Sequence, residues 1–114
     1  MAAVSEYYVI PPERRNYIRA YLKESGCSPA MAGYNVLYHV ISIAADHPEY
    51  SSTQMFEEYV EHLSGSKNSN WRSSYSIARY CFNNAVTGAR SLQEFIKEAA
   101  IGIADMVAER ASAS

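Results

Sequence analysis

MFEEYVEHLSGSKNSNWRSSYSIARYCFNNAV, residues Met55 to Val86, contains two helical patterns of apolar residues separated by the polar segment SGSKNSN. On both sides of that segment, apolar residues recur every three or four positions, as they do in amphipathic helices. The spacing predicts a short helix, a polar turn and a second helix over 70–86, so that a helix-turn-helix spans about 53–86.

The second of these helices has two chemically different faces. At about 100° per residue, four polar residues fall on one stripe: Arg72, Ser76, Arg79 and Asn83. The opposite side is predicted to carry small and apolar residues: Ser74, Ile77, Ala78, Cys81, Phe82 and Ala85. A helix that buries one face and exposes arginines and short polar side chains on the other is typical of a helix that reads DNA.

Composition places the chain among ordinary globular domains. It has 114 residues, of which 48% are hydrophobic and 19% charged, enough for one domain with a core that needs no disulfide or metal. Cys27 and Cys81 lack the spacing of a metal site, and we expect reduced thiols in a cytoplasmic protein. The start of the chain lacks a signal-peptide pattern, and no apolar run reaches membrane-spanning length. No cofactor, membrane or small-molecule substrate is expected.

The net charge of −2 at pH 7 hides an uneven distribution. No acidic residue occurs between Glu61 and Glu94, and that interval carries four basic residues: Lys67, Arg72, Arg79 and Arg90. Phosphates respond to such a local positive surface and not to the net charge. The alternative interpretation is that these residues are ordinary scatter on a solvated helix face.

The chain is expected to form an all-α bundle of about five helices, and its first half supplies two of them. The first opens at Pro11-Pro12 and runs to about Ser25, with Gly26 as its stop. Its inward side is predicted from helical spacing: Tyr17, Ile18, Tyr21 and Leu22.

The second helix is expected to begin with Ser28 as N-cap and Pro29 at its first position, and to end before Pro48. Its stripe is Ala30, Tyr34, Leu37, Ile41, Ala44 and Ala45. Gly33 then falls inside the helix, where it lowers helix stability, and we expect it to permit a close crossing with a neighbouring helix.

Two capping boxes mark the third and fifth helices. Ser51 is followed by Gln54, and Ser91 by Glu94, the spacing of a reciprocal N-cap. The third helix is predicted to bury Met55, Phe56, Tyr59, Val60 and Leu63. The fifth has the cleanest stripe of the chain: Leu92, Phe95, Ile96, Ala99, Ala100, Ile103, Met106 and Val107. This helix, over 91–108, either closes the core or forms a homodimer seam. Residues 1–10 and 111–114 are expected to be a flexible arm and tail.

The candidate DNA-binding residues divide into two groups. Residues on the approach to the fourth helix and in its first turn are expected near phosphates, where free backbone N–H groups add to the cations: Lys67, Asn70, Arg72 and Ser73. Ser69 or Asn70 can also cap this helix. Residues farther along the exposed face are candidates for base contacts: Ser76, Arg79, Tyr80 and Asn83. Since arginine pairs bidentately with guanine, Arg79 is the expected main reader. The expected partner is double-stranded DNA.

Three segments resemble the C-terminal DNA-binding domain of the stage-zero sporulation response regulator family. GCSPAMAGYNVL, residues 26–37, is similar to the family's spaced Gly, Pro-Ala, Gly-Tyr and Leu, with one extra residue before the proline. IARYCFNNAV, residues 77–86, follows the family's recognition helix, and Arg79 matches an arginine that faces DNA. SLQEFIKEAAIGIADMV, residues 91–107, is similar to the terminal helix. The resemblance implies a sporulation-related transcription regulator.

The chain also departs from that family. The family's acidic-arginine pair, which reads bases, aligns with Tyr75 and Ser76, so the resemblance implies a different operator. SGSKNSN replaces a threonine-rich turn, and only TGA separates Val86 from Arg90, where the family has an extra helix. No acidic phosphorylation pocket precedes the domain, so we expect no switch by phosphate-driven dimerisation.

Two other classes of function compete with a DNA reader. A protein-interaction module that docks on another regulator fits the negative net charge, the lost acidic-arginine pair and two tyrosines expected to be exposed, Tyr75 and Tyr80. An enzyme is not expected. The three histidines, His39, His47 and His62, show no paired-ligand spacing, and Glu57, Glu58 and Glu61 suit a solvated acidic face.

Overall fold

The computed structural model describes residues 10–62, 71–85 and 91–113. This part of the chain contains five α-helices and no strand. They are α2 (Pro12–Glu24), α3 (Tyr34–Asp46), α4 (Ser52–His62), α5 (Trp71–Ala85) and α6 (Leu92–Ala113). The all-α class expected from helical periodicity is therefore confirmed.

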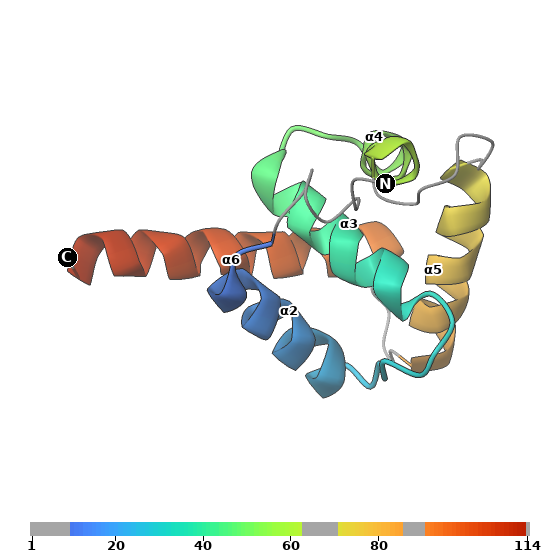
Figure 1. Cartoon of the computed structure of the whole chain (residues 1–114), viewed down its shortest axis with the longest axis horizontal. Coiled ribbons are helices and arrows are strands. Elements are labelled where there is room, and N and C mark those ends of the chain that lie inside the picture. Colours follow the sequence, from blue (N-terminus) through green and yellow to red (C-terminus); the bar gives the residue numbers. More distant parts are fainter. Residues whose placement is uncertain (1–9, 63–70, 86–90, 114) are drawn as a thin grey trace, which may run out of the picture.

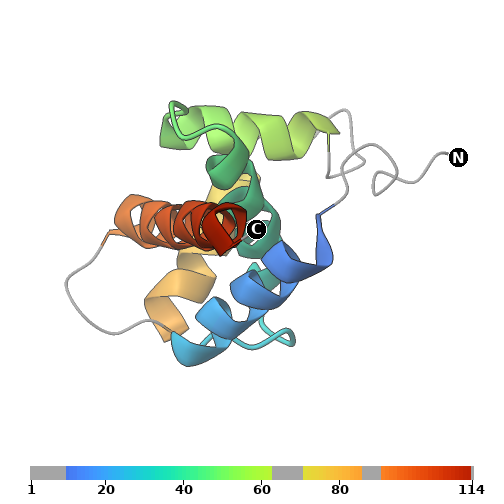
Figure 2. The ribbon, with the colours of Figure 1, turned by 90° about the vertical axis from the view of Figure 1, so that its left-hand side faces the viewer.

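The helix α3 is the centre of the packing. It is apolar nearly all round, and seven of its residues are buried: Val36, Leu37, Val40, Ile41, Ser42, Ile43 and Ala44. It contacts α2, α4, α5 and α6 (Figures 1 and 2). A helix without a polar face is stable in water only when neighbours cover it on several sides, which explains its central place.

Several boundaries lie where the sequence predicts them. The helix α2 begins at Pro12, and the chain leaves it through Gly26, whose φ of 100° suits a residue without Cβ. Both capping boxes form. The Ser51 backbone N–H donates to Gln54 Oε1 at 2.8 Å, and the Gln54 N–H donates back to Ser51 Oγ at 3.3 Å. Ser91 and Glu94 do the same at 3.0 and 3.1 Å.

The predicted start of α3, with Pro29 as its first residue, was wrong by five residues. Ser28 and Pro29 open a turn in which the Met31 N–H donates to the Ser28 carbonyl at 2.9 Å, and Ala30 is exposed. Gly33 follows with a φ of 91° and is the N-cap residue of α3, not an internal residue. A left-handed residue cannot continue an α-helix, so the helix begins only at Tyr34.

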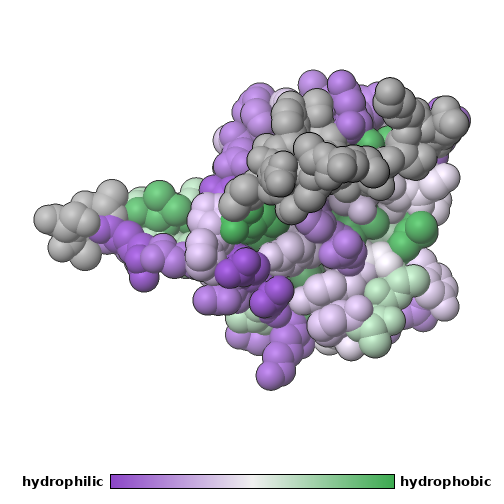
Figure 3. Space-filling model, viewed as in Figure 1, coloured by the Kyte–Doolittle hydropathy of each residue, from purple (hydrophilic) through white to green (hydrophobic). Residues whose placement is uncertain are grey.

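The helix α6 packs across the bundle with its first three turns. Six residues of its predicted stripe are buried: Leu92, Phe95, Ile96, Ala99, Ala100 and Ile103. The last two residues of the predicted stripe are not buried: Met106 is half-buried and Val107 is 53% exposed. The helix continues to Ala113, beyond the 91–108 expected for it, and its C-terminal part projects from the bundle (Figures 1 and 3).

Side chains of α2 hold α6 in place. The Tyr21 hydroxyl donates to the Phe95 carbonyl at 3.0 Å, and Arg110 near the end of α6 pairs with Glu13. Gly102 leaves room for Tyr17, because a Cβ at Gly102 would lie 1.7 Å from the Tyr17 hydroxyl oxygen. The bundle that carries α5 is therefore closed by contacts far apart in the sequence.

Candidate nucleic-acid interface

The helix α5 has a buried face and a polar face, largely as predicted. Its buried residues are Ser74, Ala78, Cys81 and Phe82. The aromatic rings on this side pack on other helices: Phe82 on Phe95 with centroids 5.2 Å apart, and Tyr75 on Phe56 at 5.2 Å. The four residues of the polar stripe are exposed: Arg72, Ser76, Arg79 and Asn83.

Two residues of α5 lie differently from the prediction. Ile77, expected to be buried, is 43% exposed. Tyr75, expected to be an exposed docking residue, is half-buried between Phe56 and Trp71. Tyr80 is 63% exposed, as expected.

The connection from α2 to α3 runs along α5 and fixes its position. A Cβ at Gly26 would lie 2.6 Å from the Ala85 carbonyl oxygen, and one at Gly33 would lie 2.3 Å from that of Ile77. The buried thiols of Cys27, on this connection, and Cys81, on α5, are near enough to influence each other's pKa. The close approach predicted for Gly33 is thus made to α5, at the entrance of α3 and not in the middle of it.

The charge of α5 is positive over its described length, Trp71–Ala85. It contains Arg72 and Arg79 and no carboxylate. The Arg72 guanidinium lies 5.7 Å from the centroid of the Trp71 ring, a distance at which a cation is attracted by an indole face. Arg79 stands in the middle of the exposed stripe, between Ser76 and Asn83.

The other predicted DNA-binding residues have different outcomes. Ser73 is exposed in the first turn of α5. Lys67 and Asn70, the capping alternative Ser69, and Arg90 lie outside the residues that the structure describes. At the other end, the Asn84 side-chain amide donates to the Tyr80 carbonyl at 2.7 Å.

Two basic residues of α2, Arg14 and Arg19, have structural roles that the sequence did not reveal. Arg14 donates to Asp46 Oδ1 at 2.8 Å and to Ser42 Oγ at 3.2 Å, which ties α2 to the end of α3. Arg19 lies above the Tyr38 ring, 5.9 Å from its centroid. Both pairings join residues distant in the sequence, so no local pattern reveals them.

The histidines with described side chains make structural contacts. His39 is half-buried and its Nδ1 hydrogen-bonds the Asn35 carbonyl at 2.8 Å, while His47 stacks on Tyr50 with centroids 4.3 Å apart. Burial lowers the pKa of His39, and the hydrogen bond to Asn35 opposes that effect. Among the described residues, no three metal-ligating side chains gather at one place, and none of the helices is both long and apolar enough to cross a bilayer.

Comparisons with protein-family models, with curated proteins and with solved structures found no match to this chain.

Proposed function

We propose that this protein is a sequence-specific DNA-binding transcription regulator in which α4 and α5 form a helix-turn-helix and α5 reads the major groove. The resemblance to the sporulation response regulator family suggested the class. The observation that carries the proposal is the exposed, carboxylate-free face of α5, set on a helix whose other face is locked into the core.

The proposed contacts follow from the chemistry of that face. Arg72 and Ser73, in the first turn, would contact backbone phosphates, which position a protein on the duplex without reading sequence. Arg79 would pair with guanine, and Ser76 and Asn83 would contact neighbouring base edges. The proposal also assigns Tyr80 to the edge of this surface, since its ring is exposed one residue after Arg79.

A selection from random DNA tests the proposal. The chain is incubated with a pool of duplexes with a randomised core, bound duplexes are recovered over several rounds, and the recovered pool is sequenced. Enrichment of one motif supports a reader, and its length gives the number of half-sites. A pool that stays random at low salt would overturn the proposal.

A protein-interaction module is the second candidate, and exposed apolar groups on α5 favour it. Ile77 and Tyr80 are 43% and 63% exposed on the same helix as Arg79. Large apolar and aromatic side chains are enriched at the centres of protein interfaces. Two results together would favour this candidate. One is a protein partner that binds the wild-type chain but not Tyr80→Ala, and the other is a DNA selection in which no motif is enriched.

We also propose a homodimer contact along α6. Two half-sites read by two copies provide the affinity that one recognition helix rarely reaches. The projecting end of α6, where Val107 is exposed beyond the core, is a suitable surface (Figure 3). Sedimentation of the wild-type chain and of Val107→Glu, with and without DNA, distinguishes a dimer formed in solution from one assembled on DNA.

A further inference from the structure

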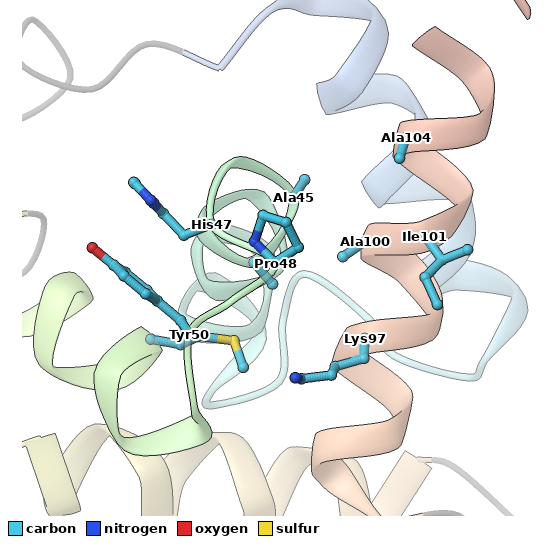
Figure 4. Close-up of a pocket in the computed structure, with 10 residues that line it drawn as sticks. Ala45, His47, Pro48, Tyr50, Lys97, Ala100, Ile101 and Ala104 are labelled. Atoms are coloured by element: carbon cyan, nitrogen blue, oxygen red, sulfur yellow. The ribbon is translucent and has the colours of Figure 1, made fainter. Parts of the chain in front are cut away.

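A pocket that the proposed DNA-binding surface does not use lies between α3, α4 and α6. It has a volume of about 280 Å³, and its walls come from the end of α3, the turn that follows, the start of α4 and the middle of α6 (Figure 4). That volume is near the small end of the range of small-molecule pockets in proteins, about 300–1,000 Å³.

Small side chains create this pocket. Four alanines line it where α3 and α6 approach each other: Ala44, Ala45, Ala100 and Ala104. Met55, which is fully buried, also lines it, and the stacked rings of His47 and Tyr50 form one rim. The opposite rim carries Ile101, whose side chain is 61% exposed. These walls suit an apolar ligand body, since apolar groups leave water most readily for such surroundings.

One cation faces this apolar space. Lys97 lies on α6 one turn before Ala100, and its ammonium group points from α6 toward the side of the pocket that Tyr50 lines (Figure 4). The side chain is half-buried, and no carboxylate among the described residues pairs with it. A charge at the edge of an apolar space attracts a counter-ion more strongly than one in open water.

We infer that this pocket binds a small amphipathic monocarboxylate, with its apolar body between α3 and α6 and its carboxylate on Lys97. The inference is independent of DNA binding, because it uses none of the exposed residues of α5. Through α3 and α4, however, the ligand would contact two of the helices that pack against α5.

The test is a titration with octanoate, below its micelle concentration, followed by amide chemical shifts of the whole chain. 1-Octanol is the neutral probe of the same length. We expect octanoate to shift the amides of Ala44, Tyr50 and Ala100 saturably, and to bind at least about tenfold more tightly than octanol because of the charge pair.

Variants separate the carboxylate contact from the apolar contact. Lys97→Met keeps the length of the side chain and removes its charge, so octanoate should lose its advantage while octanol binding is unchanged. Ala104→Phe should fill the pocket and abolish both. Lys23→Met, on α2, removes a distant charge and should leave both ligands unaffected.

Three results would overturn the inference. One is the absence of saturable shifts with octanoate, and another is equal affinity of octanoate and octanol for the wild-type chain. The third is a shift of the same amides with protein concentration alone, which would show that a second copy of the chain occupies the pocket. If Ala104→Phe fails to fold, Lys97→Met alone still decides the role of the charge.

Discussion

Gly33 lies so close to Ile77 that a Cβ on the glycine would be 2.3 Å from the isoleucine carbonyl oxygen and 2.8 Å from its carbonyl carbon. The contact joins the entrance of α3 to the backbone of α5. Because the carbonyl belongs to a helix, it cannot move without disturbing the helix. The φ of 91° at Gly33 adds a second constraint that residues with a Cβ rarely satisfy.

Replacing Gly33 with alanine is therefore expected to destabilise the fold. Left-handed strain alone costs on the order of 1–3 kcal/mol, and the collision with α5 adds to it. Denaturant unfolding followed by circular dichroism measures the loss. The matched control is Gly102→Ala, where the added Cβ meets the end of the Tyr17 side chain, which can rotate away. A loss no larger than that of the control would contradict the role given to Gly33.

The buried thiol pair predicts a loss of stability at alkaline pH. Burial chiefly, with the neighbouring Cys81, raises the pKa of Cys27 from its ordinary 9.0 to about 12, so the folded state keeps a proton that the unfolded chain releases. Stability is therefore complete below pH 9 and falls as the pH rises toward 12. A single titrating group changes the free energy of unfolding by at most about 1.4 kcal/mol per pH unit.

Cys27→Ala should reduce the fall of the unfolding free energy with rising pH. Unfolding free energies measured between pH 8 and 11 give the difference between the variant and the wild-type chain. The remaining slope has other sources, because burial also raises the pKa of Tyr17 and Tyr59. An unchanged slope in Cys27→Ala would exclude the thiol as a source. The same burial predicts slow alkylation of Cys27 by iodoacetamide until the chain unfolds.

The half-buried His39 is expected to make the fold less stable as the pH falls, the opposite of the effect of Cys27. Burial lowers its pKa below the ordinary 6.5, so the unfolded chain binds the proton more readily than the folded one. The stability it provides is present above pH 6.5 and is lost as the pH falls through the lowered folded pKa. His39→Phe should keep the ring contacts with Tyr38 and Tyr59 and remove this acid sensitivity.

Unfolding between pH 7 and 5 measures the effect, with His47→Phe as the matched control. That control should retain the acid sensitivity that His39 creates. If the unfolding free energy fell equally with pH in the wild-type chain and in His39→Phe, His39 would not be the source of the acid sensitivity.

The helix ends that local chemistry determines could be predicted from the sequence. Ser51 with Gln54, Ser91 with Glu94, and Pro12 each satisfy or remove backbone N–H groups within one turn, and all three start helices as expected. The start of α3 could not be predicted in this way. Ser28 with Pro29 carries the same local pattern, but the chain turns again at Gly33 to pass along α5, a contact between distant segments.

The candidate site was predictable to the same extent. Periodicity alone placed Arg79 and Ser76 on an exposed face, because that face depends only on helix geometry. The exposure of Ile77 and the burial of Tyr75 depend on which helices cover the edges of α5, and periodicity does not contain that information. The pocket beside Lys97 was missed for a related reason, since it arises where three separate elements fail to fill the space between them.

The central claim is that Arg79 reads DNA sequence. The most direct measurement is fluorescence anisotropy of the wild-type chain and Arg79→Ala on a selected duplex and on a scrambled one, across a salt series. Arg15→Ala, which removes the same charge from α2, is the control. We predict wild-type binding that weakens with salt and favours the selected duplex, and a loss of about 1–3 kcal/mol of that preference in Arg79→Ala but not in Arg15→Ala. Undiminished preference in Arg79→Ala, or no binding of the wild-type chain at low salt, would contradict the claim.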